Sequence, residues 1–250
     1  MVIDLNKEKP SKFEYKYKER AAWFPDKTRF FFVVDSPIYG KEPWVSDMTP
    51  GGTSLLKDIV NGTTGSDPKM PITVGNKIFF VANNGLSTEV WSTDGTAAGT
   101  AQFTSIFPSG NSGVNVLTRA SDSLMFFTAN NGVNGTELWF SNGTAAGTGF
   151  LDLSPGSASS ITGQVTMVSM GGKAYFTAMP SCCQLNGTEI WVSDGTLAGT
   201  SMMHDWTPTP NFSPDIDRLY TANGKLFFTA NDGVNRYQNK ELWVSDGTAG

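Results

Sequence analysis

Five copies of one short segment recur along the chain and constrain its fold more than any other feature. Each copy contains an acidic residue, then a tryptophan two positions later, then a serine or threonine and an Asp or Asn. The copies are Lys41–Asp47, Thr88–Asp94, Thr136–Asn142, Thr188–Asp194 and Lys240–Asp246. Their tryptophans, Trp44, Trp91, Trp139, Trp191 and Trp243, are 47 to 52 residues apart. This period is close to that of a four-stranded propeller blade.

Each repeat unit contains four strand-like runs separated by turn residues. In the second unit these runs are Pro71–Val74, Lys77–Ala82, Glu89–Trp91 and a short run near Gln102–Phe103. We call them strands A, B, C and D in every unit. Gly75-Asn76, between A and B, is a hairpin signal. The order predicts an antiparallel meander of four strands.

Strand B carries two adjacent aromatic residues in every unit. The pairs are Phe31-Phe32, Phe79-Phe80, Phe126-Phe127, Tyr175-Phe176 and Phe227-Phe228. Neighbouring residues on a strand point to opposite faces of the sheet. Both faces must therefore be buried, which favours a blade packed between two others over a half-exposed sandwich strand.

The two ends of the chain predict ring closure. The last unit stops at 247–250 after its third strand, while Val2–Asn6 is similar to the strand D segments Leu55–Ile59 and Phe150–Leu153. A ring would also remove free sheet edges. We therefore expect one all-β domain over residues 1–250, a closed five-bladed β-propeller with four antiparallel strands per blade. The expected blades are about 21–60, 71–105, 115–154, 165–206 and 218–250, with the N-terminal strand in 1–7 completing the last blade.

The Trp-x-Ser-Asp-Gly-Thr-x-x-Gly-Thr units resemble the ELWxxDGT repeat proteins, and the resemblance covers nearly the whole chain. It departs at Pro43, at Asn142 and at Met48–Thr53. Proteins of that family are mostly large and secreted or surface-associated. The resemblance therefore implies an extracellular setting, and it supplies no catalytic residues. The units also look like the Asp-box turns of sialidase propellers, which lie far from the chemistry there.

The recurring residues of the units are interpreted as structural. Asp47, Asp94, Asp194 and Asp246 precede turns, where a short carboxylate accepts backbone N–H bonds. The five tryptophans are expected to be wedges between blades rather than a set of sugar-binding platforms.

A second recurring set of polar residues flanks the B–C loops and leaves two interpretations open. The set comprises Glu42, Glu89, Glu137, Glu189 and Glu241 after the loop, and Asn83, Asn84, Asn130, Asn131, Asn231 and Asp232 at its start. These side chains either cap the loops by hydrogen bonds or supply oxygen ligands to calcium. No other cofactor is expected.

The D–A and B–C connections differ from unit to unit and emerge on one face of the predicted blades. Variable loops on a repeated scaffold are where specificity is usually built. The candidate ligand-binding residues on this face are Tyr39, Gln184, Phe212, Arg236 and Tyr237. Lys7–Arg20, in which aromatic and charged residues alternate, is either a packed D–A connection, an extra edge strand or a partner contact.

Catalysis is not expected. Glycosidase propellers use paired carboxylates near the axis, but only Asp215 and Asp217 flank a predicted inner strand. The single histidine, His204, is expected in strand D of the fourth unit and cannot form a histidine-based metal cluster.

Charge and hydropathy exclude two classes of partner. With 18 basic and 23 acidic residues, the chain has no broad cationic face for nucleic acid. No apolar run reaches the roughly 18 residues of a membrane-spanning helix, and Met1–Glu8 lacks the apolar stretch of a signal peptide.

N-glycosylation motifs and cysteines are relevant to whether the chain lies outside the cell. Asn61, Asn134, Asn142, Asn186 and Asn211 are N-glycosylation candidates, although turns rich in Asn, Gly and Thr also create such triplets by composition. Cys182 and Cys183 are either free thiols or a vicinal disulfide.

The sequence thus predicts a non-catalytic recognition or assembly module, extracellular or on the cell surface, that binds through the loop face. A protein or glycan partner and self-assembly are all compatible with this face. A glycan-binding lectin is the alternative function, and a glycoside hydrolase is a more distant one.

Overall fold

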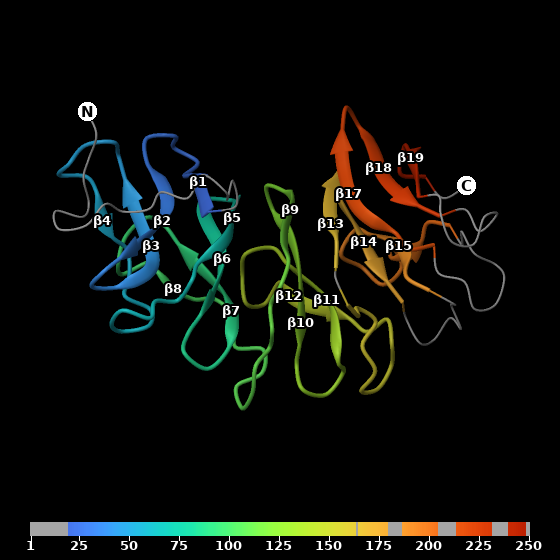
Figure 1. Cartoon of the computed structure of the whole chain (residues 1–250), viewed down its shortest axis with the longest axis horizontal. Coiled ribbons are helices and arrows are strands. Elements are labelled where there is room, and N and C mark those ends of the chain that lie inside the picture. The colour runs from blue at the N-terminus through green and yellow to red at the C-terminus, as the bar shows by residue number, and fades with distance from the viewer. Residues whose placement is uncertain (1–19, 164, 180–186, 205–213, 232–239, 249–250) are drawn as a thin grey trace. The chain divides into compact units, whose positions relative to one another are not determined.

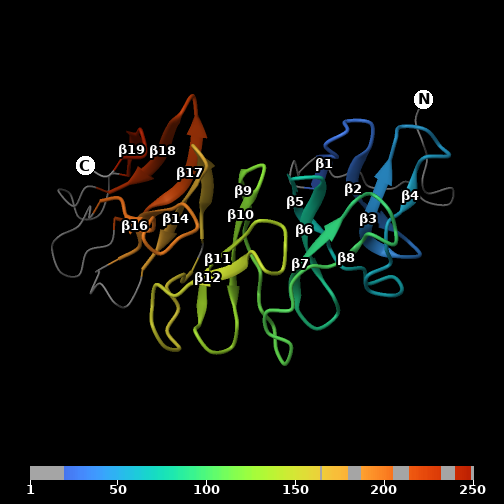
Figure 2. The same ribbon diagram turned by 180° about the vertical axis from the view of Figure 1, so that it is seen from behind.

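The computed structural model describes residues 20–163, 165–179, 187–204, 214–231 and 240–248. Its strands form five antiparallel sheets, seen from the two sides in Figures 1 and 2. In each sheet, hydrogen-bonded neighbours are consecutive in sequence. The all-β class and the meander order predicted from the sequence are therefore confirmed.

The first four sheets have four strands each. They are β1 (Ala21–Trp23), β2 (Phe30–Ser36), β3 (Gly40–Ser46) and β4 (Ser54–Leu55); β5 (Lys69–Val74), β6 (Lys77–Asn83), β7 (Thr88–Thr93) and β8 (Ala101–Gln102); β9 (Leu117–Ser121), β10 (Leu124–Asn130), β11 (Thr136–Ser141) and β12 (Thr148–Leu151); β13 (Met167–Met170), β14 (Lys173–Ala178), β15 (Glu189–Ser193) and β16 (Ser201–Met202). Within the described residues the fifth sheet has three: β17 (Asp217–Ala222), β18 (Lys225–Ala230) and β19 (Glu241–Ser245).

The chain divides into two compact units, residues 1–117 and 118–250. In the first unit, the first two sheets pack face to face. Phe31 and Val45 of the first sheet share a buried cluster with Phe80 and Trp91 of the second, and the rings of Phe31 and Phe80 are 4.9 Å apart. The Thr73 hydroxyl donates to the Trp23 carbonyl (2.8 Å), which joins strand β5 to β1.

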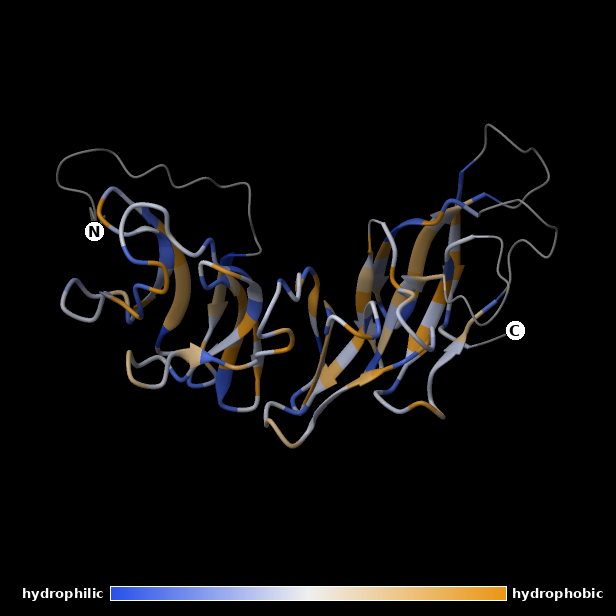
Figure 3. Cartoon of the chain, turned by 90° about the horizontal axis from the view of Figure 1, so that it is seen from below, coloured by the Kyte–Doolittle hydropathy of each residue, from blue (hydrophilic) through white to orange (hydrophobic). Residues whose placement is uncertain are grey.

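The second unit repeats this packing between the fourth and fifth sheets. Tyr175, Ile190 and Val192 of the fourth sheet are buried with Leu226 and Phe228 of the fifth. The Ser169 hydroxyl donates to the Arg119 carbonyl (2.6 Å), so β13 is tied to β9 of the third sheet. Apolar residues accordingly concentrate in the strands, as Figure 3 shows.

The aromatic pairs of strand B are buried on both faces of four sheets, as their adjacency predicts. Both members of each pair are buried in β2, β6, β10 and β14. In β18, Phe228 is buried and Phe227 is half-buried. A side chain on either face of strand B thus meets apolar neighbours in the first four sheets.

Some strand boundaries differ from those read from the sequence. Strand β5 begins at Lys69 rather than at Pro71, and its pairing with β6 shifts register between Lys69 and Ile72. The expectation that His204 lies in strand D is wrong. Strand β16 pairs with β15 through only Ser201 and Met202, so the chain has left the ladder before His204, which is exposed. Val2–Asn6 and nearly all of Lys7–Arg20 lie outside the described residues.

Candidate functional site

The turn between strands C and D has the same hydrogen bonds in the first four sheets. In the second sheet, Asp94 Oδ1 accepts the N–H (2.9 Å) and the hydroxyl (2.7 Å) of Thr96. Thr96 Oγ1 accepts the Gly99 N–H, and the Thr100 hydroxyl donates to the Thr96 carbonyl. In the same way, Oδ1 of Asp47, Asn142 and Asp194 accepts the N–H and the hydroxyl of the threonine two residues later. In the fifth sheet, Asp246 Oδ1 accepts both groups of Thr248. This is the turn role predicted for the recurring aspartates.

Two positions of this turn favour glycine. The residue after the Asp or Asn has a positive φ of 86° to 93° in four of the turns, and Met48 holds the corresponding position with φ 71°. Further along, a Cβ on Gly99 would collide with the carboxylate of Asp94. The repeated Gly-Thr pair therefore follows from the geometry of the turn.

The carboxylates of these turns are held ionised by their hydrogen bonds. The Thr96 hydroxyl lowers the pKa of Asp94 most; burial opposes it as the next largest effect, and the Thr96 N–H lowers the pKa further. Thr196 does the same for the pKa of Asp194. In these two turns the Oδ1 atom that accepts the bonds thus has structural partners.

The glutamate of strand C is buried in the first four sheets, and in the first three sheets it accepts hydrogen bonds from the linker to the following sheet. Glu137 Oε1 accepts the Ser160 N–H (2.9 Å), while Oε2 accepts the Ser160 hydroxyl (2.5 Å) and the Leu153 N–H (3.1 Å). Glu42 accepts the Ser66 hydroxyl and the Val60 N–H. Glu89 accepts the hydroxyls of three residues, Ser87, Thr104 and Ser112. These hydrogen bonds support the interpretation that Glu42, Glu89 and Glu137 cap the loops.

The linker serines were not singled out in the sequence, although a signal for them exists. Ser66, Ser112 and Ser160 follow their glutamates by 24, 23 and 23 residues. Ser213 follows Glu189 by a similar interval and lies outside the described residues. A search for hydroxyls at a fixed distance from each glutamate would have found them.

Two of these glutamates lie beside a second carboxyl group. Burial raises the pKa of Glu137, the bonds from Ser160 and Leu153 oppose that rise, and the charge of Asp152 adds to it. Burial likewise raises the pKa of Glu42, with Asp58 as the neighbouring charge. Within the described residues, one buried oxygen each of Asp58 and Asp152 has no hydrogen-bond partner, and no three His, Cys, Asp or Glu side chains gather as a metal site.

The B–C loops of the first three sheets each expose an aliphatic side chain at a tip whose backbone N–H groups are hydrogen-bonded. Asn84 Oδ1 accepts the N–H groups of Leu86 and Ser87, and Asn131 Oδ1 accepts those of Val133 and Asn134. In the first sheet, Ser36 Oγ accepts the N–H groups of Ile38 and Tyr39. Ile38 is 65% exposed, Leu86 86% and Val133 69%. These three loops therefore each present one aliphatic residue on a hydrogen-bonded backbone.

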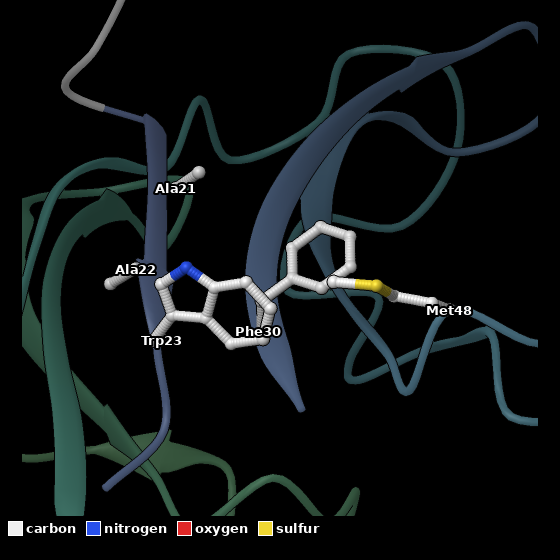
Figure 4. A pocket seen from close by; sticks show the side chains of 5 residues that line it. All are labelled: Ala21, Ala22, Trp23, Phe30 and Met48. Carbon is white, nitrogen blue, oxygen red and sulfur yellow. The ribbon is translucent and has the colours of Figure 1, made fainter. Parts of the chain in front are cut away.

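A small apolar pocket of about 180 Å³ lies on the first sheet, lined by Ala21, Ala22, Trp23, Phe30 and Met48 (Figure 4). The ring of Phe30 is 5.6 Å from that of Trp23. Phe30 and its strand neighbour Phe31 point to opposite faces, so the pocket lies on the face away from the second sheet. Its volume is below the roughly 300 Å³ of an ordinary ligand site.

The predicted ligand-binding residues fall mostly outside the described part of the chain. Tyr39 is half-buried, and its N–H belongs to the Ser36 frame. Gln184, Phe212, Arg236 and Tyr237 lie outside the described residues, as do Cys182 and Cys183.

The sequons differ in what surrounds the asparagine. Asn61 is exposed. Asn134 donates through Nδ2 to Asp152 (3.0 Å), and Asn142 accepts from Thr144 in its turn. Asn186 and Asn211 lie outside the described residues.

The five tryptophans lie at equivalent positions of strand C. Trp91 belongs to the cluster between the first two sheets, and Trp243 packs against the cluster between the last two. Trp139 is 5.1 Å from Phe150 of its own sheet and donates to the Ala129 carbonyl. Trp191 is buried and Trp44 half-buried.

No family model matches this sequence, and no curated protein matches it. Among solved structures, the chain is similar to a puromycin hydrolase, with 13% identity and a TM-score of 0.51 over 84% of this chain and 32% of that one. It is also similar to the GH74 xyloglucanase from Xanthomonas campestris, with 12% identity and a TM-score of 0.50 over 91% of this chain and 38% of that one. The chain spans about a third of the length of these proteins. At this identity the likeness bears on fold alone, and that fold is propeller-like.

The described part of the chain contains no helix long and apolar enough to cross a membrane.

Proposed function

We propose that this chain is a closed five-bladed β-propeller that serves as a non-catalytic recognition or assembly module outside the cell or on its surface. The five meander sheets and the propeller-like neighbours support the fold. The resemblance to ELWxxDGT repeat proteins supports the compartment. The B–C and D–A loop face is the binding surface.

One observation carries the recognition function: Ile38, Leu86 and Val133 are exposed at equivalent loop tips. Isolated exposed aliphatic residues are ordinary, but these three recur at one position of the repeat. Asn84 and Asn131 satisfy the N–H groups of their tips, so burying such a tip against a partner costs little backbone desolvation. A protein surface with shallow apolar pockets is the partner that fits them best.

The recurring carboxylates support a non-catalytic role because their contacts are structural. Asp94 shapes a turn, and Glu137 fastens a linker through three hydrogen bonds. The exposed loop tips, by contrast, carry aliphatic side chains that supply binding area rather than acid or base chemistry.

Closure of the ring is supported by the outer faces of the first and last sheets. Phe30 and Trp23 line an apolar pocket on the outer face of the first sheet, and Leu242 and Val244 are exposed on the fifth. The corresponding faces of neighbouring sheets are buried against each other in both units. In the proposed ring, Val2–Asn6 adds the fourth strand of the last blade.

The test measures binding of the purified chain to arrays of extracellular protein domains and of glycans, with calcium and with a chelator. A triple variant, Ile38→Ser, Leu86→Ser and Val133→Ser, is compared with Leu197→Ser. Leu197 is 67% exposed but lies in a C–D turn, so it is a matched control. We expect the triple variant to weaken protein binding at least about tenfold, given the apolar area removed, and the control to bind normally.

Saturable glycan binding without protein binding would replace this proposal with the lectin function, and loss of it in chelator would place calcium in the site. Protein binding that survives the triple variant but not Leu197→Ser would contradict the choice of face.

A further inference from the structure

The exposed tip of the B–C loop in the third sheet is connected by hydrogen bonds to a pair of carboxyl groups. Asn131 Oδ1 accepts the N–H groups of Val133 and Asn134, and Asn131 Nδ2 donates to Asn134 Oδ1 (3.0 Å). Asn134 Nδ2 then donates to Asp152 Oδ2 (3.0 Å). The charge of Asp152 acts in turn on the buried Glu137. The backbone of the tip is therefore coupled to both carboxyl groups.

Asp152 has one oxygen atom that needs a donor. Its Oδ1 is buried and has no hydrogen-bond partner within the described residues. Such an atom costs free energy unless a donor reaches it. Both oxygens of Glu137 accept hydrogen bonds, from Ser160 and Leu153, so an ionised Glu137 has no donor to offer. A protonated Glu137 has one.

The second sheet fills the same two roles with neutral side chains. The ladders of the two sheets place Thr104 at the position of Asp152. The Thr104 hydroxyl donates to Glu89 Oε2 (2.7 Å). The side-chain oxygen of Gln102 accepts the hydrogen bond from the loop residue Asn84 (2.9 Å). In the third sheet Asp152 holds both positions, so a complete set of hydrogen bonds requires a proton there.

We propose that Glu137 and Asp152 share one proton, and that loss of this proton with rising pH loosens the Val133 tip. The inference rests on the proposed function, because it makes one apolar tip of that binding face sensitive to pH. With the proton in place, Glu137 donates to Asp152 Oδ1 while Asp152 Oδ2 still accepts from Asn134. Without it, two negative charges repel each other, and the half-buried Asp152 turns towards solvent and releases Asn134.

The direction of the response follows from the surroundings of Glu137. Burial raises the pKa of this carboxyl group, the hydrogen bonds from Ser160 and Leu153 oppose the rise, and the charge of Asp152 adds to it. The folded chain therefore keeps the proton to a higher pH than the unfolded chain does. The tip is ordered in mild acid and loosens as the pH rises through the raised pKa.

The elements around the pair contain no other titratable side chain. Strands β10 and β12, the loop 131–135 and the linker 153–161 have no Asp, Glu, His, Cys, Tyr, Lys or Arg. The residue after β14, Met179, donates its N–H to the linker. Within β14, Tyr175 packs against the fifth sheet, and Lys173 acts on the C–D turn of its own sheet. The proton exchange therefore concerns the two carboxyl groups alone.

The experiment follows the mobility of the tip in the full chain, with Cys182 and Cys183 replaced by serine. A thiol-reactive fluorophore with pH-independent emission is attached to Val133→Cys and, in a second chain, to Leu86→Cys. Leu86 is the matched control, because its tip has the same backbone hydrogen bonds but is connected to the neutral Gln102. Fluorescence anisotropy between pH 4 and pH 8 reports the local motion of each label.

We expect the anisotropy of the label at position 133 to fall as the pH rises, with a midpoint above the ordinary pKa of glutamate, and the label at position 86 to show no change. Glu137→Gln and Asp152→Asn should each abolish the fall and keep the anisotropy high, because an uncharged amide supplies the donor. Asp58→Asn, which alters the carboxyl group beside the glutamate of the first sheet, should leave the fall intact.

A flat profile at position 133 would overturn the proposal, and so would equal falls at both positions, since the loosening would then not belong to this tip. A fall that survives in both Glu137→Gln and Asp152→Asn would assign the titration to another group and would overturn it as well. The labels report without a partner. A blank binding array would therefore leave this result standing, and a flat profile would leave the binding face standing.

Discussion

At the scale of single residues, the C–D turn requires an oxygen acceptor rather than a charge. Asn142 Oδ1 accepts the N–H (3.0 Å) and hydroxyl (2.7 Å) of Thr144 in the same way as Asp94 accepts those of Thr96. In the repeat, Asn142 stands where the other four copies have an aspartate. The hydrogen bonds explain why the departure is tolerated.

Asp94→Asn should therefore change the free energy of unfolding by less than about 0.5 kcal/mol, whereas Asp94→Ala should lower it by about 1 kcal/mol, as for other caps of backbone N–H groups. Urea unfolding followed by tryptophan fluorescence measures both. Equal losses in the two variants would show that the charge itself is needed.

Met48 stands where the other turns have glycine, with φ 71°. The left-handed region costs a residue with a Cβ about 1 kcal/mol. Met48→Gly should raise the free energy of unfolding by about 1 kcal/mol, and Gly143→Ala, at the equivalent position with φ 86°, should lower it by a similar amount. Urea midpoints check both; a loss of stability in Met48→Gly would mean that its side-chain contacts outweigh the backbone strain.

The buried Glu137 makes stability depend on pH in a specific direction. Burial raises its pKa above the usual value, so the folded chain holds this proton more tightly than the unfolded chain. The stabilising contribution is complete below the ordinary pKa of glutamate and is lost as the pH rises through the folded pKa. The turn aspartates, whose pKa values are lowered, act in the opposite direction and lose their contribution in acid.

We therefore compare the free energy of unfolding of the wild type with that of Glu137→Gln. The wild type minus the variant should be largest in mild acid, and this difference should shrink as the pH rises. Urea titrations between pH 4 and pH 8 measure this difference, in which unaltered groups cancel. A difference that grows with rising pH would contradict the burial of this carboxyl group.

At the scale of elements, the sequence predicts strands well and linkers poorly. The adjacent pair Phe126-Phe127 indicates two buried faces, and both rings are buried. The start of β5 lies beyond a register shift in its pairing with β6. The end of β16 before His204 reflects a ladder of only two residue pairs. No residue pattern marks either feature. The Glu137–Ser160 contact joins positions 23 residues apart, so it is visible only when repeats are compared with one another.

Phe126→Ala and Phe127→Ala should each lower the free energy of unfolding by about 3–5 kcal/mol, because each ring is buried on its own face of the sheet. Thermal and urea unfolding of the two variants provide the comparison. If one of them costs less than about 1 kcal/mol, that face of the third sheet is open to solvent.

At the scale of the whole molecule, the repeat predicts the number of sheets but not what the variable loops bind. The five tryptophans of the repeat indicate five units, and five sheets are present. The sequence places Ile38, Leu86 and Val133 in B–C loops, but their exposure depends on where their side chains point, which no residue pattern marks. Four of the five predicted ligand-binding residues lie outside the described part of the chain.

The central claim is that the five sheets close into one ring, and small-angle X-ray scattering of the monomer fraction from a size-exclusion column tests it most directly. A compact chain of this length should have a radius of gyration of about 18 Å, independent of concentration. A clearly larger radius, with a distance distribution extending into a long tail, would contradict the closed ring.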